Sequence, residues 1–398
     1  MHLYSRLSVM IVALLIIPFA RSQPTIAQPE EKSAIPAAPE IAANAYILID
    51  ASTGSLLAEK NADQHLPPAS LTKLMSSYLV IDEIQRGLIS ESNLVKISIK
   101  AWKMGGSRMF VKEGTQVSVG ELLRGVIIQS GNDATIALAE YISGDEQAFV
   151  DMMNKKARDL GMEETHFADA SGMPAENHFT SARDLSKLAR AIINDHPDYY
   201  HLYAEKSYTY NNIRQPNRNL LLERDRTVDG LKTGNTEEAG YCLVASAKRE
   251  ATRLIAVILG AKSDEARATE AQKLLNYGFK HFETITLYAN NKTVTKAQVW
   301  EGKTAEFSLG LNESIQLTIP QGKAEQITPK VRPPKMITAP IQKGEQYGIL
   351  SIELDDKVLS TQHLIALESV EQANFFQRLW DRVKLFFRKT FNRDETKI

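Results

Sequence analysis

The chain has 398 residues, of which 43% are apolar and 24% are charged, so it can bury a large core and has room for two domains. This composition excludes a disordered or fibrous protein, and a formal net charge of −1 gives no overall electrostatic reason to bind nucleic acid. The single cysteine, Cys242, excludes an intramolecular disulfide. The fold must therefore depend on its core.

The N-terminus carries a cation followed by an apolar stretch. Arg6 precedes residues 7–20, which are mostly apolar, and Pro18 and small residues end the stretch. This order is typical of a secretory signal peptide, which we assign to residues 1–27, with cleavage after Ala20 or Ala27. The alternative is an uncleaved N-terminal anchor, although the apolar core is short for the roughly 20 residues of a spanning helix. Export is expected in either case.

The next segment is rich in Pro, Ala and Glu and is expected to be an exposed tether over residues 28–39. Alternating apolar residues at 46–49 and 55–58 flank Ala51-Ser52-Thr53-Gly54 and predict a β-hairpin. Apolar residues three and four apart predict helices over 70–84, 119–128, 133–142 and 182–193.

Strands are expected again in the second half of the chain. Short apolar runs at 240–246 and 252–260 have the pattern of buried strands, and the first of them contains Cys242, which is expected to be a buried, unreactive thiol. From about residue 287, short alternating segments such as 306–309 and 314–319 are separated by Gly, Pro, Asn and Lys. They predict a second, all-β domain with a sandwich-like arrangement.

Three short motifs follow one another along the first domain: Ser70-Leu71-Thr72-Lys73, Ser130-Gly131-Asn132 and Lys232-Thr233-Gly234. Each motif alone is a weak signal, and a Ser followed three residues later by Lys also fits a solvated helix face. Their contexts strengthen them. Pro67 and Pro68 predict a helix that begins near Ser70, with Ser70 and Lys73 on one face and the positive end of the helix dipole at the nucleophile.

These residue types suit nucleophilic catalysis by a serine. A serine hydroxyl needs a neighbouring base, and Lys73 can act as one if burial and nearby cations lower its pKa. Lys232 can supply such a field, and Ser130 can relay a proton to a leaving amine. The Asn132 amide can both donate to and accept from a substrate peptide bond, while Thr233 and the following backbone amides suit a strand edge that receives a peptide and its carboxylate.

At these residues the sequence resembles the penicillin-binding proteins and β-lactamases, and most of all the low-molecular-mass D-alanyl-D-alanine carboxypeptidases. The resemblance covers roughly residues 45–282, including Ser130-Gly131-Asn132-Asp133-Ala134, Ala170-Ser171-Gly172-Met173-Pro174 and Asp229-Gly230-Leu231-Lys232-Thr233-Gly234. It implies an α/β (α+β) transpeptidase-like catalytic domain, which we place at residues 40–284, before a β-rich domain at 285–371. It also implies hydrolysis of the terminal D-Ala of peptidoglycan pentapeptides, and covalent binding of β-lactams.

The resemblance further implies a role for each matching residue. Ser70 would form the acyl-enzyme, Lys73 would be its general base, and Ser130 and Lys232 would assist proton transfer. The substrate amide and carboxylate would be held by Asn132, Thr233, Gly234 and Arg267, and the backbone amides of Ser70 and Asn235 would form the oxyanion hole. Arg267 could instead be an ordinary surface arginine.

One position departs from the family. Asn235 follows Lys-Thr-Gly where many members have histidine, so a side-chain contribution to deacylation is in doubt. His166 and His178, in the segment after the second motif, are expected to be hydrogen-bonded structural residues. No histidine pair has metal-ligand spacing, and neither a metal nor a cofactor is expected.

The tail, residues 372–398, is expected to begin with an amphipathic helix. Between 372 and 392 the apolar positions follow helical spacing (Phe376, Leu379, Trp380, Val383, Phe386, Phe387, Phe391), and the cations lie largely on the opposite face (Arg378, Arg382, Lys384, Arg388, Lys389). The charges exclude a spanning helix, whereas an aromatic face beside cations suits the surface of an anionic membrane. A helix packed on the β domain is the alternative. The expected location is the periplasmic face of the bacterial inner membrane.

Two rival functions stay open at this point. A serine β-lactamase of class A would need a Glu-x-x-x-Asn loop after the second motif, and residues 151–180 contain none. A non-catalytic, membrane-bound module that binds the cell wall or senses penicillin is the second rival, and the intact Ser70, Lys73 and Lys232 argue against it.

Overall fold

The computed structural model describes residues 35–332 and 336–391. The expected signal peptide and the first part of the tether lie outside these residues, as does the end of the tail.

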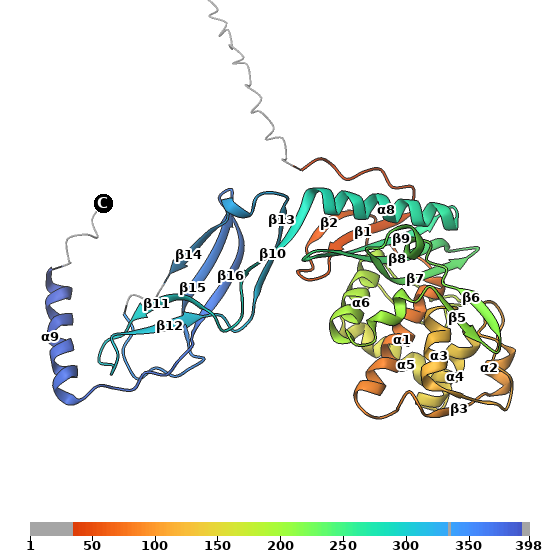
Figure 1. Ribbon diagram of the computed structural model, residues 1–398, viewed down its shortest axis with the longest axis horizontal. Helices are drawn as coiled ribbons and strands as arrows, with labels where there is room; N and C mark the ends of the chain where they lie inside the picture. Colours follow the sequence, from red (N-terminus) through yellow and green to blue (C-terminus); the bar gives the residue numbers. More distant parts are fainter. Residues whose placement is uncertain (1–34, 333–335, 392–398) are drawn as a thin grey trace, which may run out of the picture. The chain divides into compact units, whose positions relative to one another are not determined.

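A five-stranded antiparallel sheet is the centre of the first domain (Figure 1). Its strands, in the order β2-β1-β9-β8-β7, are β2 (Leu56–Lys60), β1 (Ala45–Asp50), β9 (Thr252–Ala261), β8 (Gly240–Arg249) and β7 (Val228–Thr236). The β1–β2 hairpin and the strands at β8 and β9 confirm the sequence predictions. Within the described residues β7 pairs only with β8, so its other edge is open beside the catalytic motifs.

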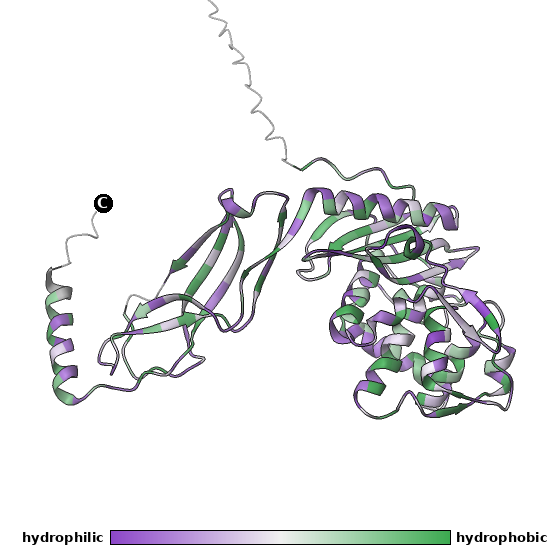
Figure 2. Cartoon of the chain, viewed as in Figure 1, coloured by the Kyte–Doolittle hydropathy of each residue, from purple (hydrophilic) through white to green (hydrophobic). Residues whose placement is uncertain are grey.

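Alternation along the strands gives the sheet two apolar faces, and helices cover both (Figures 1 and 2). On one face Ile47, Val244 and Val257 join the core of the helical layer. That layer contains α1 (Lys73–Gln85), α3 (Val119–Ile127), α4 (Asn132–Ser143), α5 (Glu146–Asp159) and α6 (Ala182–Asp195). On the other face Leu48 and Leu254 pack against α8 (Asp264–His281). The domain is therefore a sheet between two layers of helix.

Four of these helices match the predicted ones, whereas α5 and α8 were not predicted. Both have start signals that the sequence shows: the side chain of Asp145 caps α5, and the side chain of Ser263 caps α8, with Asp264 and Glu265 in its first turn. The Cys242 thiol is buried, and burial raises its pKa to about 11, as expected for an unreactive thiol.

Short elements complete the domain. They are η1 (Ala69–Thr72), β3 (Leu94–Lys96), α2 (Ile99–Lys103), β4 (Gln116–Ser118), η2 (Tyr200–Ala204), β5 (Ser207–Tyr210), β6 (Ile213–Pro216) and α7 (Leu221–Arg224).

Asp133, in the first turn of α4, fixes the segment that leads from α2 toward the motifs. Its buried carboxylate accepts from the backbone amides of Met109, Phe110 and Val111, at 2.8, 2.8 and 3.2 Å. Since Asp133 follows the Ser130-Gly131-Asn132 motif directly, these bonds hold the 109–111 backbone against the start of α4.

The predicted β-rich domain is confirmed and has a core of its own. Its five-stranded sheet, in the order β11-β12-β16-β15-β14, comprises β11 (Thr293–Gln298), β12 (Glu306–Gly310), β16 (Lys357–Ala366), β15 (Gln346–Leu354) and β14 (Thr328–Arg332). A second sheet pairs β10 (Phe282–Tyr288) with β13 (Ile315–Pro320), and η3 (Ala324–Gln326) follows. Phe307, Leu309, Leu350 and Ile352 are among the core residues.

The tail forms α9 (Phe375–Phe391), three residues later than the sequence pattern suggested. Two of its cations form ion pairs: Arg378 and Arg382 pair with Glu301, at 3.4 and 2.9 Å. The apolar residues are exposed: Phe375 by 70%, Phe376 by 80% and Trp380 by 61%. The apolar face of α9 is therefore not buried against the β domain, although polar residues of the helix bond to Glu301. No helix in the described part of the chain is long and apolar enough to span a bilayer.

We predict that Asp133→Ala lowers the free energy of unfolding by on the order of 3 kcal/mol or more, because it leaves several amides without their acceptor. Asp145→Ala is the control, since it removes one exposed cap bond and should cost about 1 kcal/mol. Urea denaturation followed by circular dichroism measures both. Equal losses in the two variants would contradict the role given to Asp133.

Candidate active site

Ser70 lies in a 3₁₀ turn and not, as predicted, at the start of an α-helix. The turn η1 spans Ala69–Thr72, with a left-handed Ala69 at a φ of 47°, and α1 starts only at Lys73. Side chains at i and i+3 eclipse in a 3₁₀ turn, which places Ser70 and Lys73 on one face, as the motif predicted. The Lys73 Nζ lies 3.1 Å from the Ser70 Oγ.

Lys73 is buried, with only 1% of its surface exposed. Burial is the main reason that its pKa falls to about 7; Asp169 and Asp133 oppose the fall, and the charge of Arg218 adds to it. The Nζ also donates to the backbone carbonyl of Ser171 at 2.5 Å. A neutral amine can keep this bond and still offer its lone pair to the Ser70 hydroxyl.

Ser130 and Asn132 flank the start of α4. The Ser130 backbone has a φ of 58°, a costly conformation for a residue other than glycine that often marks functional sites. Its Oγ is buried without a hydrogen-bond partner among residues 35–332 and 336–391. The Asn132 Nδ2 donates to the Gly105 carbonyl at 2.7 Å, which orients the amide beside Gly106.

The Lys232-Thr233-Gly234 motif lies on the open edge strand β7. Gly234 allows β7 to approach the Ser70 turn, because a Cβ there would lie 2.9 Å from the Pro68 carbonyl oxygen. Lys232 is buried, and burial, followed by the charges of Lys73, Arg218 and Arg267, lowers its pKa. The two lysines therefore disfavour each other's protonation.

Arg267 projects from α8 and is buried, not on the surface. It donates to the carbonyls of Gly234 at 3.2 Å and Arg218 at 3.4 Å, and stacks over the Tyr241 ring. Burial lowers its pKa. It therefore holds the backbone of β7 at Gly234, within the third motif.

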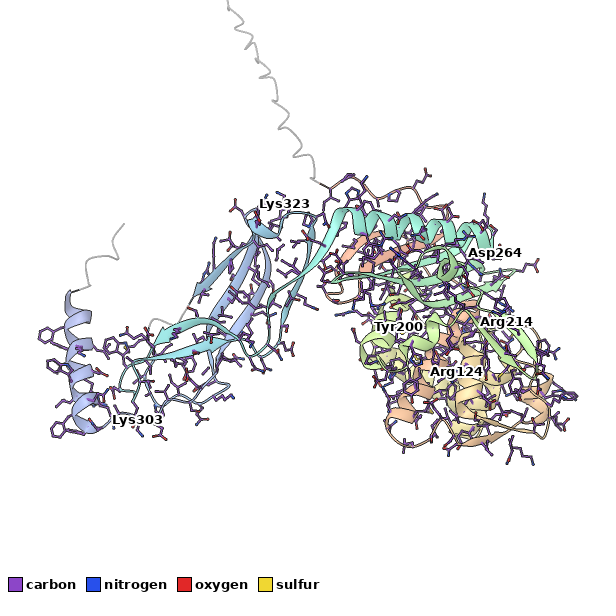
Figure 3. The ribbon with its side chains drawn as sticks, viewed as in Figure 1. Arg124, Tyr200, Arg214, Asp264, Lys303 and Lys323 are labelled. Carbon is purple, nitrogen blue, oxygen red and sulfur yellow. The ribbon has the colours of Figure 1, made fainter. Side chains whose placement is uncertain are left out.

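One cleft of about 690 Å³ joins these elements. Six of the sequence-predicted residues line it: Ser70, Ser130, Thr233, Gly234, Asn235 and Arg267. The lining residues do not include Lys73, Lys232 or Asn132. Other residues of the same three motifs, Ser70, Thr233 and Ser130, line the cleft instead. The Asn235 side chain is exposed and donates to the Gly240 carbonyl at 3.1 Å. Asp264, in the first turn of α8 (Figure 3), also lines the cleft.

The sequence analysis missed two contributors. Arg218 lines the cleft with an exposed side chain, yet a lone arginine in a loop has no distinctive sequence signal. The Ser171 carbonyl was missed because a backbone acceptor depends on the path of the chain and not on the residue type.

Two parts of the chain match the profiles of known protein families. Residues 32–263 match the profile of the D-alanyl-D-alanine carboxypeptidase family, and residues 282–372 match that of the penicillin-binding protein 5 C-terminal domain. The chain is 43% identical to the D-alanyl-D-alanine carboxypeptidase DacC of Escherichia coli over 362 residues, 89% of this chain and 90% of that protein. It is 40% identical to DacA of the same species over 368 residues, with coverages of 90% and 91%.

Solved structures give the same result. Penicillin-binding protein 5 of Haemophilus influenzae matches with a TM-score of 0.79 at 40% identity, over 84% of this chain and 99% of that chain. Penicillin-binding protein D2 of Listeria monocytogenes, in an ampicillin-bound form, matches with a TM-score of 0.57 at 30% identity, over 61% and 99%.

We predict that the rate of acylation by a penicillin rises with pH and reaches half its maximum near pH 7. The reason is that only the neutral Lys73 amine can accept a proton, and its pKa is about 7. Stopped-flow measurement with a fluorescent penicillin gives the profile, with protein stability checked at each pH. A rate that does not change across neutral pH would contradict Lys73 as the base.

Proposed function

The chain belongs to the D-alanyl-D-alanine carboxypeptidase family and is a serine-type D-Ala-D-Ala carboxypeptidase, and we propose that it works through an acyl-enzyme on Ser70. The observation that supports this best is the 3.1 Å contact between the buried amine of Lys73 and the Oγ of Ser70, which lines the cleft.

In the acylation step, neutral Lys73 takes the proton of the Ser70 hydroxyl while the Oγ attacks the carbonyl carbon between the two D-alanines. The backbone amides of Ser70 and Asn235 stabilise the oxyanion. When the C–N bond breaks, Ser130 passes its proton to the amine of the leaving D-alanine and recovers one from the protonated Lys73, and Lys232 assists this transfer. Water then hydrolyses the ester and restores Ser70.

Substrate binding is proposed to use the β7 edge. An extended peptide can add to this strand, with Asn132 at the scissile amide and Thr233, Gly234 and Arg267 near the terminal carboxylate. Arg218 adds a second guanidinium to that side of the cleft. Asn235 contributes through its backbone amide, since its side chain is already bonded to Gly240.

A β-lactam enters the same cleft in this proposal. The ampicillin-bound relative from Listeria monocytogenes supports it, because this chain matches 99% of that protein at 30% identity. Ser70 would open the β-lactam ring and keep it as an ester. Neither nucleic acid nor a cofactor has a part in this chemistry.

We propose the following organisation: signal peptide 1–27, tether 28–39, catalytic domain 40–284, β-rich domain 285–371, and tail 372–398. The end of α8 at His281 and the start of β10 at Phe282 support a boundary close to 284. The exported protein would lie at the periplasmic face of the inner membrane, held at the anionic surface by the exposed aromatic residues of α9.

We predict that Ser70→Ala abolishes covalent labelling by fluorescent penicillin and leaves the fold intact, since it removes one oxygen from the wall of a cleft. Gel fluorescence measures the label, and thermal denaturation checks the fold. Ser107→Ala is a matched control at another serine of the same cleft and should still be labelled. Persistent labelling of the Ser70→Ala variant at another residue would overturn the mechanism.

We predict that deleting residues 375–398 from the mature protein releases it from anionic vesicles while D-Ala release from a soluble peptide continues. The cut spares Ala373, which is buried and bonded to the Glu301 carbonyl. Each fully buried apolar side chain stabilises the bound state by roughly 1.5–3 kcal/mol, and each nearby cation adds about 1 kcal/mol, with partial burial reducing both. Cosedimentation gives the binding.

The matched point variants are Phe376→Ser with Trp380→Ser, which should weaken vesicle binding, and Gln377→Ser, which should not. If the truncated protein still sediments with vesicles, or loses soluble-peptide activity by unfolding, the tail is a structural element and not an anchor.

A further inference from the structure

The segment between α5 and α6 carries a partly buried carboxylate, Asp169, that organises its own backbone. The Asp169 Oδ1 accepts from the Ser171 amide at 2.6 Å, the Ser171 hydroxyl at 3.0 Å and the Gly172 amide at 2.7 Å. These three bonds fix the Ser171 peptide group. Its carbonyl is the one that binds the Lys73 Nζ, so Asp169 sets the position of the base through one residue.

The second oxygen of Asp169 meets His178. The His178 Nδ1 lies 3.0 Å from the Asp169 Oδ2, and the imidazole is almost fully buried, with 2% of the side chain exposed. The edge of the His178 ring packs against Phe167. The pair thus closes the segment on itself, with the imidazole buried and the carboxylate partly exposed.

His178 also reaches the nucleophile's turn. Its Nε2 lies 2.9 Å from the Thr72 Oγ1, and the Thr72 hydroxyl donates to the Ala69 carbonyl at 2.8 Å. The Thr72 hydroxyl has one proton, and it donates this proton to the Ala69 carbonyl, which can only accept. The bond between His178 and Thr72 therefore forms at the same time when the His178 Nε2 donates to the Thr72 oxygen. The Nδ1 donates to the carboxylate. An imidazole that donates from both nitrogens is a cation, and His178 and Asp169 are then an ion pair.

A third contact joins the same two segments through backbone. Gly172 has a φ of 90°, and a Cβ there would lie 1.8 Å from the Ala69 carbonyl oxygen and 2.9 Å from the Ser70 nitrogen. The segment is therefore in van der Waals contact with the turn that carries Ser70.

The charge of Asp169 acts on Lys73, and His178 acts on Asp169. Burial by itself would raise the Asp169 pKa, but the hydrogen bond and charge of His178 and the amides of Ser171 and Gly172 outweigh it and lower the pKa to about 2. The Asp169 charge in turn raises the Lys73 pKa against the effect of burial. The other charged groups that act on or near Lys73 are Asp133, Arg218 and Lys232. Near the segment itself, Glu146 accepts from the Ala170 amide and pairs with Lys100.

We propose that Asp169 and His178 are a positioning pair for the acylation step: together they hold the Ser171 carbonyl on Lys73 and the Thr72 hydroxyl on the Ser70 turn, and the Asp169 charge, balanced by His178, tunes the base. This proposal rests on Lys73 acting as the general base for Ser70. Neither residue is among those that line the cleft, so the pair acts through Ser171 and Thr72.

The test compares the pH profile of penicillin acylation in the full-length wild type, Asp169→Asn, His178→Gln and His166→Gln. The amide introduced by Asp169→Asn keeps an oxygen for the three donors and removes the charge, so the fold should persist. His166 is the matched control, because it lies in the same segment, is exposed, and bonds only to the Asn177 carbonyl through its ring. Thermal denaturation is measured for every variant.

We expect Asp169→Asn to move the acid limb of the profile to lower pH, because Lys73 loses a negative charge that favours its protonation. We expect His178→Gln to move the limb to higher pH, because the Asp169 charge is then uncompensated. The plateau rate should fall in both variants, by up to about 100-fold for a displaced base. His166→Gln should match the wild type.

If both variants keep the wild-type acid limb, or both move it in the same direction, the pair is only structural and the proposal is overturned. If one variant is too unstable to assay, the other variant decides the test. A shift of its acid limb in the stated direction supports the proposal, and any other result overturns it. A wild type that is not acylated at all would instead refute the proposed function, so the two failures are distinguishable.

Discussion

The site depends on the burial of one amine. Lys73 has 1% of its surface exposed, and a buried ammonium is costly unless it is paired. The structure gives it the Ser171 carbonyl and the Ser70 hydroxyl and no carboxylate in direct contact among the described residues, so the neutral amine becomes accessible near neutral pH. An ion pair in place of the carbonyl would favour the protonated form and remove the base.

The rest of the catalytic domain keeps this amine buried and aimed. The 3₁₀ turn before α1 aligns Ser70 with Lys73, and Gly172 and Gly234 allow backbone to approach that turn from two sides. The approach of β7 also brings Lys232 near Lys73, and each cation disfavours protonation of the other. Arg267 supports β7 through the Gly234 carbonyl. The positions of the first and third motifs are therefore coupled through backbone contacts as much as through side chains.

Much of this could be predicted from the sequence, because the signals are local. The β1–β2 hairpin follows from alternation around Ala51-Ser52-Thr53-Gly54, and the three motifs carry their chemistry in their residue types. The 3₁₀ turn at Ala69–Thr72 could not be predicted, since it includes a left-handed Ala69 that packs against Gly172. The pairing of Arg378 and Arg382 with Glu301 likewise joins residues about eighty positions apart and has no local pattern. The roles of the Ser171 carbonyl and of Asp169 were invisible for the same reason.

The central claim is that hydrolysis passes through an ester on Ser70 with Lys73 as its base. The most direct measurement is to incubate the purified protein with a pentapeptide ending in D-Ala-D-Ala, quench at short times, and follow both released D-Ala and the mass of the proteolytic fragment that contains Ser70. We predict that D-Ala is released and that this fragment transiently carries the mass of the shortened peptide. Release of D-Ala without any such adduct, or with the adduct on a fragment that lacks Ser70, would contradict the account.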